Sequence, residues 1–546
     1  MWLPLLALAA LIWLAWIARA GLLVARIFQI EEYEASRLIH WSRQRTWLVP
    51  RALQAGLLAT CLAAAVTAII PSATRLPVLA GGWCAGLAML HVLWRSPAAK
   101  KPLVYTPRAR RLLGAAAVLA VLAAAVLLVA VYAAPFGISA ILVIGVLLAS
   151  PALAVTFILG GNTALKPVET RVRVGFVRKA RAKLEQIGPT VVGVAGSYGK
   201  TSTKHITARF LQTHAETLPT PKSFNTLMGI TRTINDNLER KHRIFVVEMD
   251  AYGPGEIESM CDLVRPAIAV VTSVGPQHLE RFKTVSAIAA AIYELVASLP
   301  REAPAVIYAG DADSAGLADR AAAEGHRVIR YGLEGLGCGP LDVTAGGVVI
   351  TDGLTRFTFR WEAQGISEQV AIPLLGEHNI LNVSAALVVT QLLGGSIASA
   401  VEAARSLEPV PNRLQLIRGA GGVTIIDDSY NANPVGMHNG LKVLAQMDAR
   451  ARILVTPGMV ELGTVEDSEN QRLGEHAAQV CDRVLLVGAV HTRPILAGLH
   501  AAGFSGDRIH VMETLDEVTA TLRTVLQPGD VVLFANDLPD TYLELE

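Results

Sequence analysis

The chain has 546 residues, of which 52% are hydrophobic and 17% charged, and its formal net charge is +2 at pH 7. A net charge this close to zero gives no reason to expect nucleic acid as a partner. The length allows about three or four domains. The mean hydropathy of +0.43 conceals an uneven distribution, because apolar residues crowd into the first third and the chain beyond about residue 186 resembles a soluble protein.

The first third contains five apolar runs, near 2–24, 51–71, 76–94, 112–133 and 135–159. Each is close to the ~20 residues that a helix needs to cross the hydrocarbon core. The first run lacks the basic start of a signal peptide. Arg19 follows an apolar stretch, from which its side chain can reach the interface. The sequence therefore predicts an α-helical membrane domain of about five spans over residues 1–160.

Basic residues mark two of the loops between these runs. The loop after the first run carries Arg26, Arg37, Arg43, Arg45 and Arg51, and the loop after the third carries Arg95, Lys100, Lys101, Arg108, Arg110 and Arg111. The positive-inside rule places both loops in the cytoplasm. We therefore expect a multi-pass protein of the cytoplasmic membrane, with the N-terminus outside and the remainder of the chain inside, where ATP is. No acidic residue lies within a run, which favours an anchor over a transporter.

Residues 161–187 form a basic linker that includes the segment "VETRVRVGFVRKARAKLEQ". Two interpretations remain open for this segment. One is an amphipathic helix that lies near anionic lipid headgroups. The other is a solvated linker helix.

The segment "TVVGVAGSYGKTSTKHITARFLQ" has the pattern of a strand, a tight glycine loop and a helix. Gly196 and Gly199 leave room for phosphate to approach the backbone, Lys200 brings a positive charge to the outer phosphates, and Thr201 offers a hydroxyl to Mg²⁺. The long form of the motif would need a glycine at Val194, so only G-x-x-G-K-T is present. This pattern predicts a P-loop that binds ATP and Mg²⁺.

Strands and helices alternate after the P-loop, which indicates a doubly wound α/β domain over residues 188–406. Glu248 ends one predicted strand and His278 follows another, and ligands collect at such strand ends. Both side chains could therefore reach a metal beside the phosphates. Short alternating runs over 341–375 predict antiparallel hairpins at a sheet edge, followed by a helix around 378–393.

A second α/β domain of Rossmann-like character is predicted over residues 407–546. Its expected strands are "VTIIDDS", "RILVTPG", "RVLLVG", "RIHVM" and "DVVLFAN". No G-x-G-x-x-G follows any of them, so a dinucleotide site is not expected. Arg413, at the boundary, could meet phosphate across a domain cleft, or it could be a surface charge.

From about residue 188 to 535 the chain resembles the Mur ligase family. The motifs that carry the resemblance are "GSYGKTST", "SFNTLMG", "VVEMDAYGPGEI", "HLERF", "GEHNILN", "PNR", "DDSYNANP" and "PGMVELG". The last two most resemble the branch that adds D-alanyl-D-alanine to a muramoyl tripeptide. The resemblance implies a bacterial enzyme of cell-wall synthesis in which ATP phosphorylates a carboxylate and an amine attacks the acyl phosphate.

The resemblance also implies roles for particular residues. Lys200, Glu248 and His278 would be catalytic, and Thr201, Glu248 and His278 would hold magnesium. ATP would be bound by Gly196, Ser197, Tyr198, Gly199, Lys200, Thr201, Ser202, Asn379, Asn382, Arg413 and Asp428. The substrates would contact Asn225, Thr226, Asn431 and Asn433. Lysine, Mg²⁺ and backbone N–H groups are the groups that stabilise the negative charge of acyl phosphate formation.

Three departures from the family pattern stand out. The lysine that commonly carries a carbamate in these ligases is replaced by Ile292, which cannot carry one. The C-terminal Lys-Gly-Ser-Arg is replaced by "FANDLPD" at 534–540, and the soluble N-terminal domain that binds the uridine nucleotide is replaced by the apolar runs. The third departure suggests that the precursor is lipid-linked or is delivered at the membrane.

Two alternatives remain beside this reading. The protein could be a ligase for another peptide or for a polyglutamate-type polymer. It could also be a degenerate ligase that acts as a membrane scaffold, which Ile292 favours and the intact P-loop disfavours. The expected partners are a nucleotide- or lipid-linked cell-wall precursor, an amine such as D-alanyl-D-alanine and the lipid bilayer. The sequence leaves the oligomeric state open.

Overall fold

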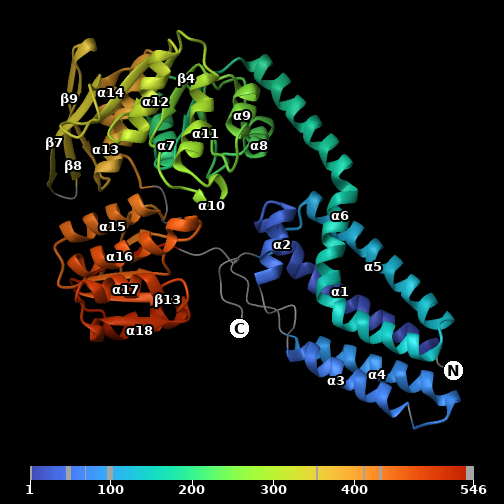
Figure 1. Ribbon diagram of the computed structural model, residues 1–546. Coiled ribbons are helices and arrows are strands. Elements are labelled where there is room, and N and C mark those ends of the chain that lie inside the picture. Colours follow the sequence, from blue (N-terminus) through green and yellow to red (C-terminus); the bar gives the residue numbers. More distant parts are fainter. Residues whose placement is uncertain are drawn as a thin grey trace. The chain divides into compact units, whose positions relative to one another are not determined.

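The computed structural model describes residues 3–44, 51–67, 69–94, 102–351, 354–409, 412–429 and 433–536. Two compact units divide the chain, one over residues 1–173 and the other over 174–537. Each unit has its own hydrophobic core, and each is described by itself. Figure 1 labels many of the helices and some of the strands.

The first unit is helical. Its helices are α1 (Leu3–Ile30), α2 (Ala35–Gln44), α3 (Arg51–Val66), α4 (Ser72–Leu93), α5 (Pro107–Ala133) and the first part of α6 (Phe136–Ile187). Trp13, Trp16 and Trp83 are fully buried in its core. Among the described residues, α1, α5, α6 and residues 74–93 of α4 are long and apolar enough to cross a membrane.

The run at 51–71 forms a shorter helix than expected, and the number of spans stays a prediction. Helix α3 has 16 residues. At ~1.5 Å per residue it reaches about 24 Å, less than the ~30 Å of a hydrocarbon core. It packs as one arm of a close hairpin with α4, in which the Cβ of an alanine at Gly86 would lie 2.6 Å from the carbonyl oxygen of Gly56.

The packing of the helices brings the helix ends that border the two basic loops to one end of the unit. Gly56 of α3 faces Gly86 of α4, so the start of α3 lies level with the end of α4. The end of α1 meets the start of α5, because the Gln29 side chain donates to the carbonyl oxygen of Val104 at 2.9 Å. These contacts gather the starts of α3 and α5 and the ends of α1 and α4, which border the basic loops.

Arg19 reaches the end of α4, and its position at a membrane interface stays a prediction. Its guanidinium donates to the carbonyl oxygens of His91 at 2.7 Å and Trp94 at 2.9 Å. It also lies over the Trp94 ring, 5.1 Å from the ring centroid. The charge is thereby placed among the unpaired carbonyl groups of a helix C-terminus, where a cation is favoured.

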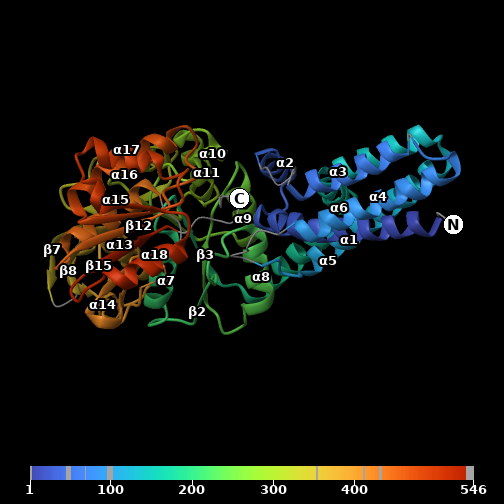
Figure 2. The ribbon, with the colours of Figure 1, turned by 90° about the horizontal axis from the view of Figure 1, so that it is seen from below.

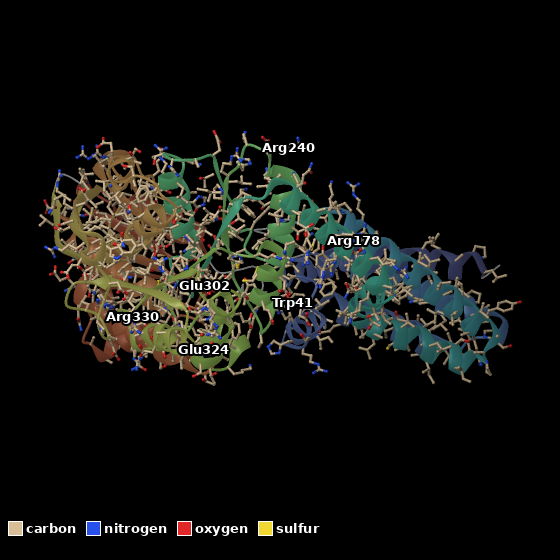
Figure 3. All side chains as sticks on the ribbon, turned by 90° about the horizontal axis from the view of Figure 1, so that it is seen from above. Trp41, Arg178, Arg240, Glu302, Glu324 and Arg330 are labelled. Carbon is tan, nitrogen blue, oxygen red and sulfur yellow. The ribbon has the colours of Figure 1, made fainter. Side chains whose placement is uncertain are left out.

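Helix α6 is continuous over 52 residues and includes the whole basic linker predicted at 161–187. Arg178, labelled in Figure 3, is exposed, as is Phe176 two residues earlier. Near the C-terminus of the helix, Ala180 and Leu184 are buried against the core of the second unit. The linker is therefore helical, and contact with anionic lipid remains a prediction.

The second unit begins with a nine-stranded sheet in the order β2-β3-β1-β4-β5-β6-β7-β8-β9. Its strands are β1 (Thr190–Ala195), β2 (Thr217–Pro219), β3 (Ile244–Glu248), β4 (Ile268–Val271), β5 (Pro304–Tyr308), β6 (Arg327–Leu333), β7 (Val343–Thr351), β8 (Leu354–Trp361) and β9 (Ile366–Ile372). The pairs from β2 to β7 are parallel, and β7, β8 and β9 pair antiparallel. The predicted hairpins over 341–375 are confirmed.

Helices cover both faces of this sheet, which is the doubly wound arrangement predicted. One face packs against α7 (Lys200–Leu211), α13 (Glu377–Leu392) and α14 (Ile397–Ala404). The other packs against α8 (Leu227–Asn237), α9 (Glu256–Val264), α11 (Val285–Ala297) and α12 (Ala312–Ala323). Alternating residues of β1 explain this, because Val192 and Val194 enter the first core and Val191 enters the second.

The C-terminal part forms a six-stranded sheet in the order β10-β11-β15-β12-β13-β14. Its strands are β10 (Gln415–Arg418), β11 (Thr424–Asp428), β12 (Arg452–Thr456), β13 (Arg483–Val487), β14 (Ile509–Met512) and β15 (Val531–Ala535). Helices α15 (Pro434–Gln446), α16 (Glu466–Val480) and α17 (Arg493–Ala501) pack on one face, and α18 (Leu515–Val525) packs on the other (Figure 2). All five predicted strands are confirmed, and the antiparallel β10 was not predicted.

The α3–α4 hairpin gives a test of the first unit. We predict that Gly86→Ala destabilises the helical unit by about 1–3 kcal/mol, the usual effect of overpacking, because the added methyl group would meet the Gly56 backbone. Gly81→Ala is the matched control, since a Cβ there meets nothing within 4 Å. SDS titration of the detergent-solubilised protein measures both variants, and equal midpoints would contradict the hairpin packing.

Candidate active site

The P-loop joins the end of β1 to the start of α7. Gly196 and Gly199 both have positive φ, at 141° and 79°. The Cβ of an alanine would lie 2.9 Å from the Ser273 carbonyl oxygen at position 196, and 2.7 Å from Asn382 Oδ1 at position 199. Both positions therefore require glycine. The N-terminus of α7 presents unpaired N–H groups beside this loop, as a phosphate site requires.

Lys200 is buried and lies over the loop. Its Nζ donates to the carbonyl oxygens of Gly196 at 2.6 Å and Ser197 at 3.2 Å, and to Gln277 Oε1 at 3.2 Å. Asp250 Oδ1 lies 3.2 Å from the same nitrogen. The loop thus carries a fixed positive charge at the place where the sequence predicted the outer phosphates.

Glu248 is the buried anion of the site, 1% exposed at the end of β3. The Thr201 hydroxyl donates to its Oε1 at 3.0 Å, and Lys204 Nζ donates to its Oε2 at 2.9 Å. Burial by itself would raise the pKa of Glu248, but the charges of Lys204 and Lys200 and the hydrogen bonds from Lys204 and Thr201 together outweigh it, and the pKa lies below its ordinary value. Glu248 is therefore ionised beside Thr201, as the predicted metal set requires.

The predicted substrate residues near β3 also have defined places. Asn225 donates from its Nδ2 to Glu248 Oε1 at 3.1 Å and to Asp250 Oδ2 at 3.4 Å. Thr226 is the N-cap of α8, and its hydroxyl accepts from the Gly229 N–H at 3.3 Å. The structure thus brings Asn225 into the charged cluster and uses the Thr226 side chain to begin a helix.

His278 precedes α10 (Leu279–Phe282) and has a left-handed backbone with φ of 53°. Its Nδ1 lies 2.9 Å from Glu461 Oε2 of the C-terminal sheet region. Its Nε2 is buried without a hydrogen-bond partner, 4.0 Å from Asp250 Oδ2. An uncharged imidazole that donates from Nδ1 to a carboxylate leaves the Nε2 lone pair available as a ligand.

A pocket lies beside the P-loop, and the residues of three motifs line it. Gly196, Asp250, Gln277 and His278 contribute to its wall, together with Ile292 of α11. The departure noted at residue 292 is therefore part of the site itself. Its buried hydrocarbon side chain supplies no charge there.

Within the part of the chain that the structure describes, no group of three or more histidine, cysteine, aspartate or glutamate side chains is arranged to hold a metal ion. Mg²⁺ at nucleotide sites is usually held by one or two protein groups with phosphates and water. The unpartnered Nε2 of His278 and the ionised Glu248 beside the Thr201 hydroxyl suit that role. The residues present therefore fit a magnesium ion that shares its ligands with a nucleotide.

Asn379 and Asn382, on the first turns of α13, are buried behind the P-loop. Asn379 Nδ2 donates to the Leu375 carbonyl oxygen at 2.8 Å, and Asn382 Nδ2 donates to Asn379 Oδ1 at 3.3 Å. Asn382 Oδ1 accepts from the Thr203 hydroxyl at 3.0 Å. In this structure the pair supports helix α7 and the loop, and its contact with a nucleotide remains a prediction.

The other predicted loop residues lie close to the site. The Ser197 hydroxyl donates to the Gly275 carbonyl oxygen at 3.0 Å, and Ser202 lies on the first turn of α7. The Tyr198 N–H donates to Ser273 Oγ at 3.2 Å, while its own hydroxyl is buried without a partner. Desolvation raises the pKa of that phenol, so it is neutral.

The predicted site residues of the C-terminal domain differ in their relation to the site. The positive charge of Arg413 acts on His205 of α7, whose pKa is lowered to about 4 chiefly by burial. The Leu414 N–H donates to Asp428 Oδ1 at 3.2 Å, and burial raises the pKa of Asp428 to about 6. Asn433 is the N-cap of α15, while Asn431 lies outside the described residues.

Three charged residues of the cluster were not predicted. Lys204 lies one turn beyond Lys200, and Asp250 lies two residues beyond Glu248. On a helix, residues four apart lie on the same face, and on an extended segment residues two apart do. The sequence therefore indicated that Lys204 lies beside Lys200 and that Asp250 lies on the same side as Glu248. Glu461 is 183 residues from His278, and only its motif "PGMVELG" marked it.

The fold and the site define a P-loop enzyme with two α/β domains. Sequence comparison agrees, because the Mur ligase middle domain matches residues 194–390 and the Mur ligase glutamate ligase domain matches 412–536. The UDP-N-acetylmuramoyl-tripeptide–D-alanyl-D-alanine ligase of Mycobacterium tuberculosis is 34% identical over 371 residues, which is 64% of this chain and 71% of the relative. The same ligase of Escherichia coli is 32% identical and covers 58% and 68%.

Solved structures give the same answer. MurF from Acinetobacter baumannii matches with a TM-score of 0.60 and 26% identity, covering 68% of this chain and 78% of that one. MurF ligase from Thermotoga maritima in complex with ADP matches with a TM-score of 0.59 and 28% identity, covering 68% and 81%. The chain belongs to the Mur ligase family. It is a MurF-like, ATP-dependent ligase that forms ADP.

Asp428 gives a pH-dependent prediction. Its pKa is raised on folding, so ionisation costs stability above pH 6, and the cost disappears as the pH falls from about 6 toward 3.8, the ordinary value. We predict that Asp428→Asn raises the thermal midpoint at pH 7.5 and that the gain shrinks toward pH 4. The exposed Asp448 serves as the control in Asp448→Asn. A gain that is the same at both pH values would contradict the burial of Asp428.

Proposed function

We propose that this protein is a membrane-anchored ligase that joins a cell-wall precursor carboxylate to an amine, with D-alanyl-D-alanine as the favoured amine. The observation that carries the proposal is the charged cluster on the P-loop, where Lys200, Thr201 and Glu248 meet in one buried network. The relatives named as D-alanyl-D-alanine-adding ligases support the choice of substrates. Those names also support a place in peptidoglycan precursor synthesis.

The chemistry follows from the charges of the site. A carboxylate oxygen of the precursor attacks the γ-phosphorus of ATP, and the bond from that phosphorus to ADP breaks. Lys200 and the N–H groups at the start of α7 stabilise the negative charge that gathers on the transferred phosphoryl group. The amine nitrogen then attacks the acyl carbon and loses a proton, and phosphate leaves with one oxygen of the original carboxylate.

Magnesium would be held by Thr201, Glu248 and His278, and it would neutralise phosphate charge beside the loop. Asn225, which already bonds Glu248, is the residue best placed to orient the precursor carboxylate. Arg413 and Asp428 would meet the nucleotide from the C-terminal domain. The charge of Arg413 already acts on Lys204 and His205, which supports this assignment.

The helices of the first unit support anchoring in the bilayer. Among the residues that the structure describes, four of them are long and apolar enough to span it, and lipid-facing candidates such as Val126 and Ile141 are strongly exposed. The shared end of the helices beside both basic loops supports the predicted orientation, with the ligase domains in the cytoplasm. An anchor keeps the ligase near an acceptor that is lipid-linked or delivered at the membrane.

The test uses the full-length protein in detergent with ATP and Mg²⁺, and it measures phosphate release. Soluble and lipid-linked muramoyl tripeptides are offered with D-alanyl-D-alanine. We predict release that needs both substrates, is faster with the lipid-linked precursor, and falls by about 10²–10³-fold in Lys200→Ala. Other amino acids, glutamate included, test the alternative of a different peptide or polymer.

Two results would contradict the proposal. Equal rates with soluble and lipid-linked precursors would contradict the lipid-linked acceptor. No release above that of a folded Lys200→Ala protein, with any amine, would contradict the ligase assignment. Ile292 in the pocket would then indicate a site that has lost its activity, and a membrane scaffold would be the better interpretation of the protein's function.

A further inference from the structure

Asp250 occupies a central place in the pocket beside the P-loop, and no role has been assigned to it so far. Its side chain is 13% exposed. Oδ1 lies 3.2 Å from Lys200 Nζ and accepts from the Ala251 N–H at 3.1 Å. Oδ2 lies 4.0 Å from His278 Nε2, and its other neighbour is Asn225 Nδ2 at 3.4 Å, a long hydrogen bond. Oδ2 of this carboxylate therefore accepts only a long hydrogen bond, and it lies close to an imidazole nitrogen that has no hydrogen-bond partner.

The state of His278 is set from the other side. Nδ1 lies 2.9 Å from Glu461 Oε2, and a carboxylate at that distance accepts the Nδ1 proton. Nε2 is then the ring nitrogen left to bind a cation, and it is buried without a hydrogen-bond partner. Both His278 and Glu461 have left-handed backbones, with φ of 53° and 65°, so the surrounding structure holds both residues in strained conformations.

We propose that Asp250 is a ligand, with His278 Nε2, of a divalent cation of the Mg²⁺ or Mn²⁺ type, and that Glu461 is the positioning residue for His278. The distance fits this assignment. Two ligands that are each about 2.1 Å from one ion lie up to about 4.2 Å apart, and these two atoms are 4.0 Å apart. The remaining ligands are phosphate oxygens and water, so the inference rests on the proposed nucleotide chemistry.

Asp250 would add a ligand on the His278 side of the pocket to the cation for which Thr201, Glu248 and His278 are proposed. The Glu248 carboxylate already accepts hydrogen bonds from Lys204, Thr201 and Asn225. Ile292 lines the same pocket and offers no ligand. Asp250 therefore supplies the negative charge on the His278 side of the pocket, where a cation would also relieve its pairing with Lys200 and free that lysine for phosphate.

Glu461 adds a consequence for the domains. It belongs to the C-terminal domain, whereas His278 and Asp250 belong to the middle domain. The position of the C-terminal domain therefore determines whether Nε2 is aimed at the cation. Metal affinity becomes coupled to the placement of that domain.

The test measures Mn²⁺ binding to the full-length protein in detergent with β,γ-methylene-ATP and with neither precursor nor amine. The electron paramagnetic resonance signal of free Mn²⁺ gives the affinity. We predict that Asp250→Asn lowers it at least 10-fold and that Glu461→Ala lowers it about 10–100-fold, the usual effect of losing a partner of a metal-bound histidine. Glu461→Gln can still accept the Nδ1 proton and restores most of the affinity. Asp319→Asn, at an exposed carboxylate of α12, is the matched control.

Pulsed spectra of the unmutated protein provide a readout that does not depend on any Asp250 variant folding. We predict a ¹⁴N coupling to bound Mn²⁺ that disappears in His278→Gln. Wild-type affinity in a folded Asp250→Asn protein would overturn the proposal, and so would the absence of a coupling that depends on His278. Because neither precursor nor amine is present, both results can be obtained even if the proposed substrates of the ligase are wrong.

Discussion

The buried ion pair between Glu248 and Lys204 is the interaction on which the site depends. The two side chains are 1% and 0% exposed, and they lie 2.9 Å apart. Removing one member of such a pair is strongly destabilising, because the other charge is left buried and uncompensated. The pair ties the end of β3 to α7, and Thr201 and Asn225 join it through the same carboxylate. Strand, helix and substrate loop are therefore fixed together before any ligand binds.

The P-loop leads into α7, the helix that the ion pair fixes to β3, so its position depends on that pair. Its two glycines approach Ser273 and Asn382 so closely that no side chain fits. Lys200 is then directed over the loop and not into solvent. The middle domain thus supplies a rigid, positively charged phosphate site, and the C-terminal domain adds charge through Arg413 and Glu461, which lie far along the chain from the loop.

Much of this arrangement could be predicted from the sequence, because it follows local rules. The strand, glycine loop and helix at 190–211, the hairpins over 341–375 and the five C-terminal strands each have a residue pattern of their own. Glu248 and His278 were found because strand ends gather ligands in parallel sheets. The family resemblance rested on the same short motifs, and comparison with known ligases confirmed it.

The features that the sequence did not predict depend on contacts between residues far apart in the chain or on the packing of helices. The contact of Glu461 with His278 joins residues 183 positions apart, and no local pattern specifies it. The helix in the run at 51–71 ends at Val66, and its close packing on α4 through Gly56 and Gly86 has no local pattern that specifies it. Asp250 was overlooked because the motif that contains it was interpreted through Glu248 alone.

The central claim is that this chain activates a carboxylate as an acyl phosphate on its P-loop. The most direct measurement uses a muramoyl tripeptide whose acceptor carboxylate carries ¹⁸O, with ATP, Mg²⁺ and D-alanyl-D-alanine. The isotope shift in the ³¹P spectrum of the released phosphate shows which oxygen it contains. The account predicts one ¹⁸O in each phosphate formed with the new amide bond. Amide formation with phosphate that contains only ¹⁶O would contradict it.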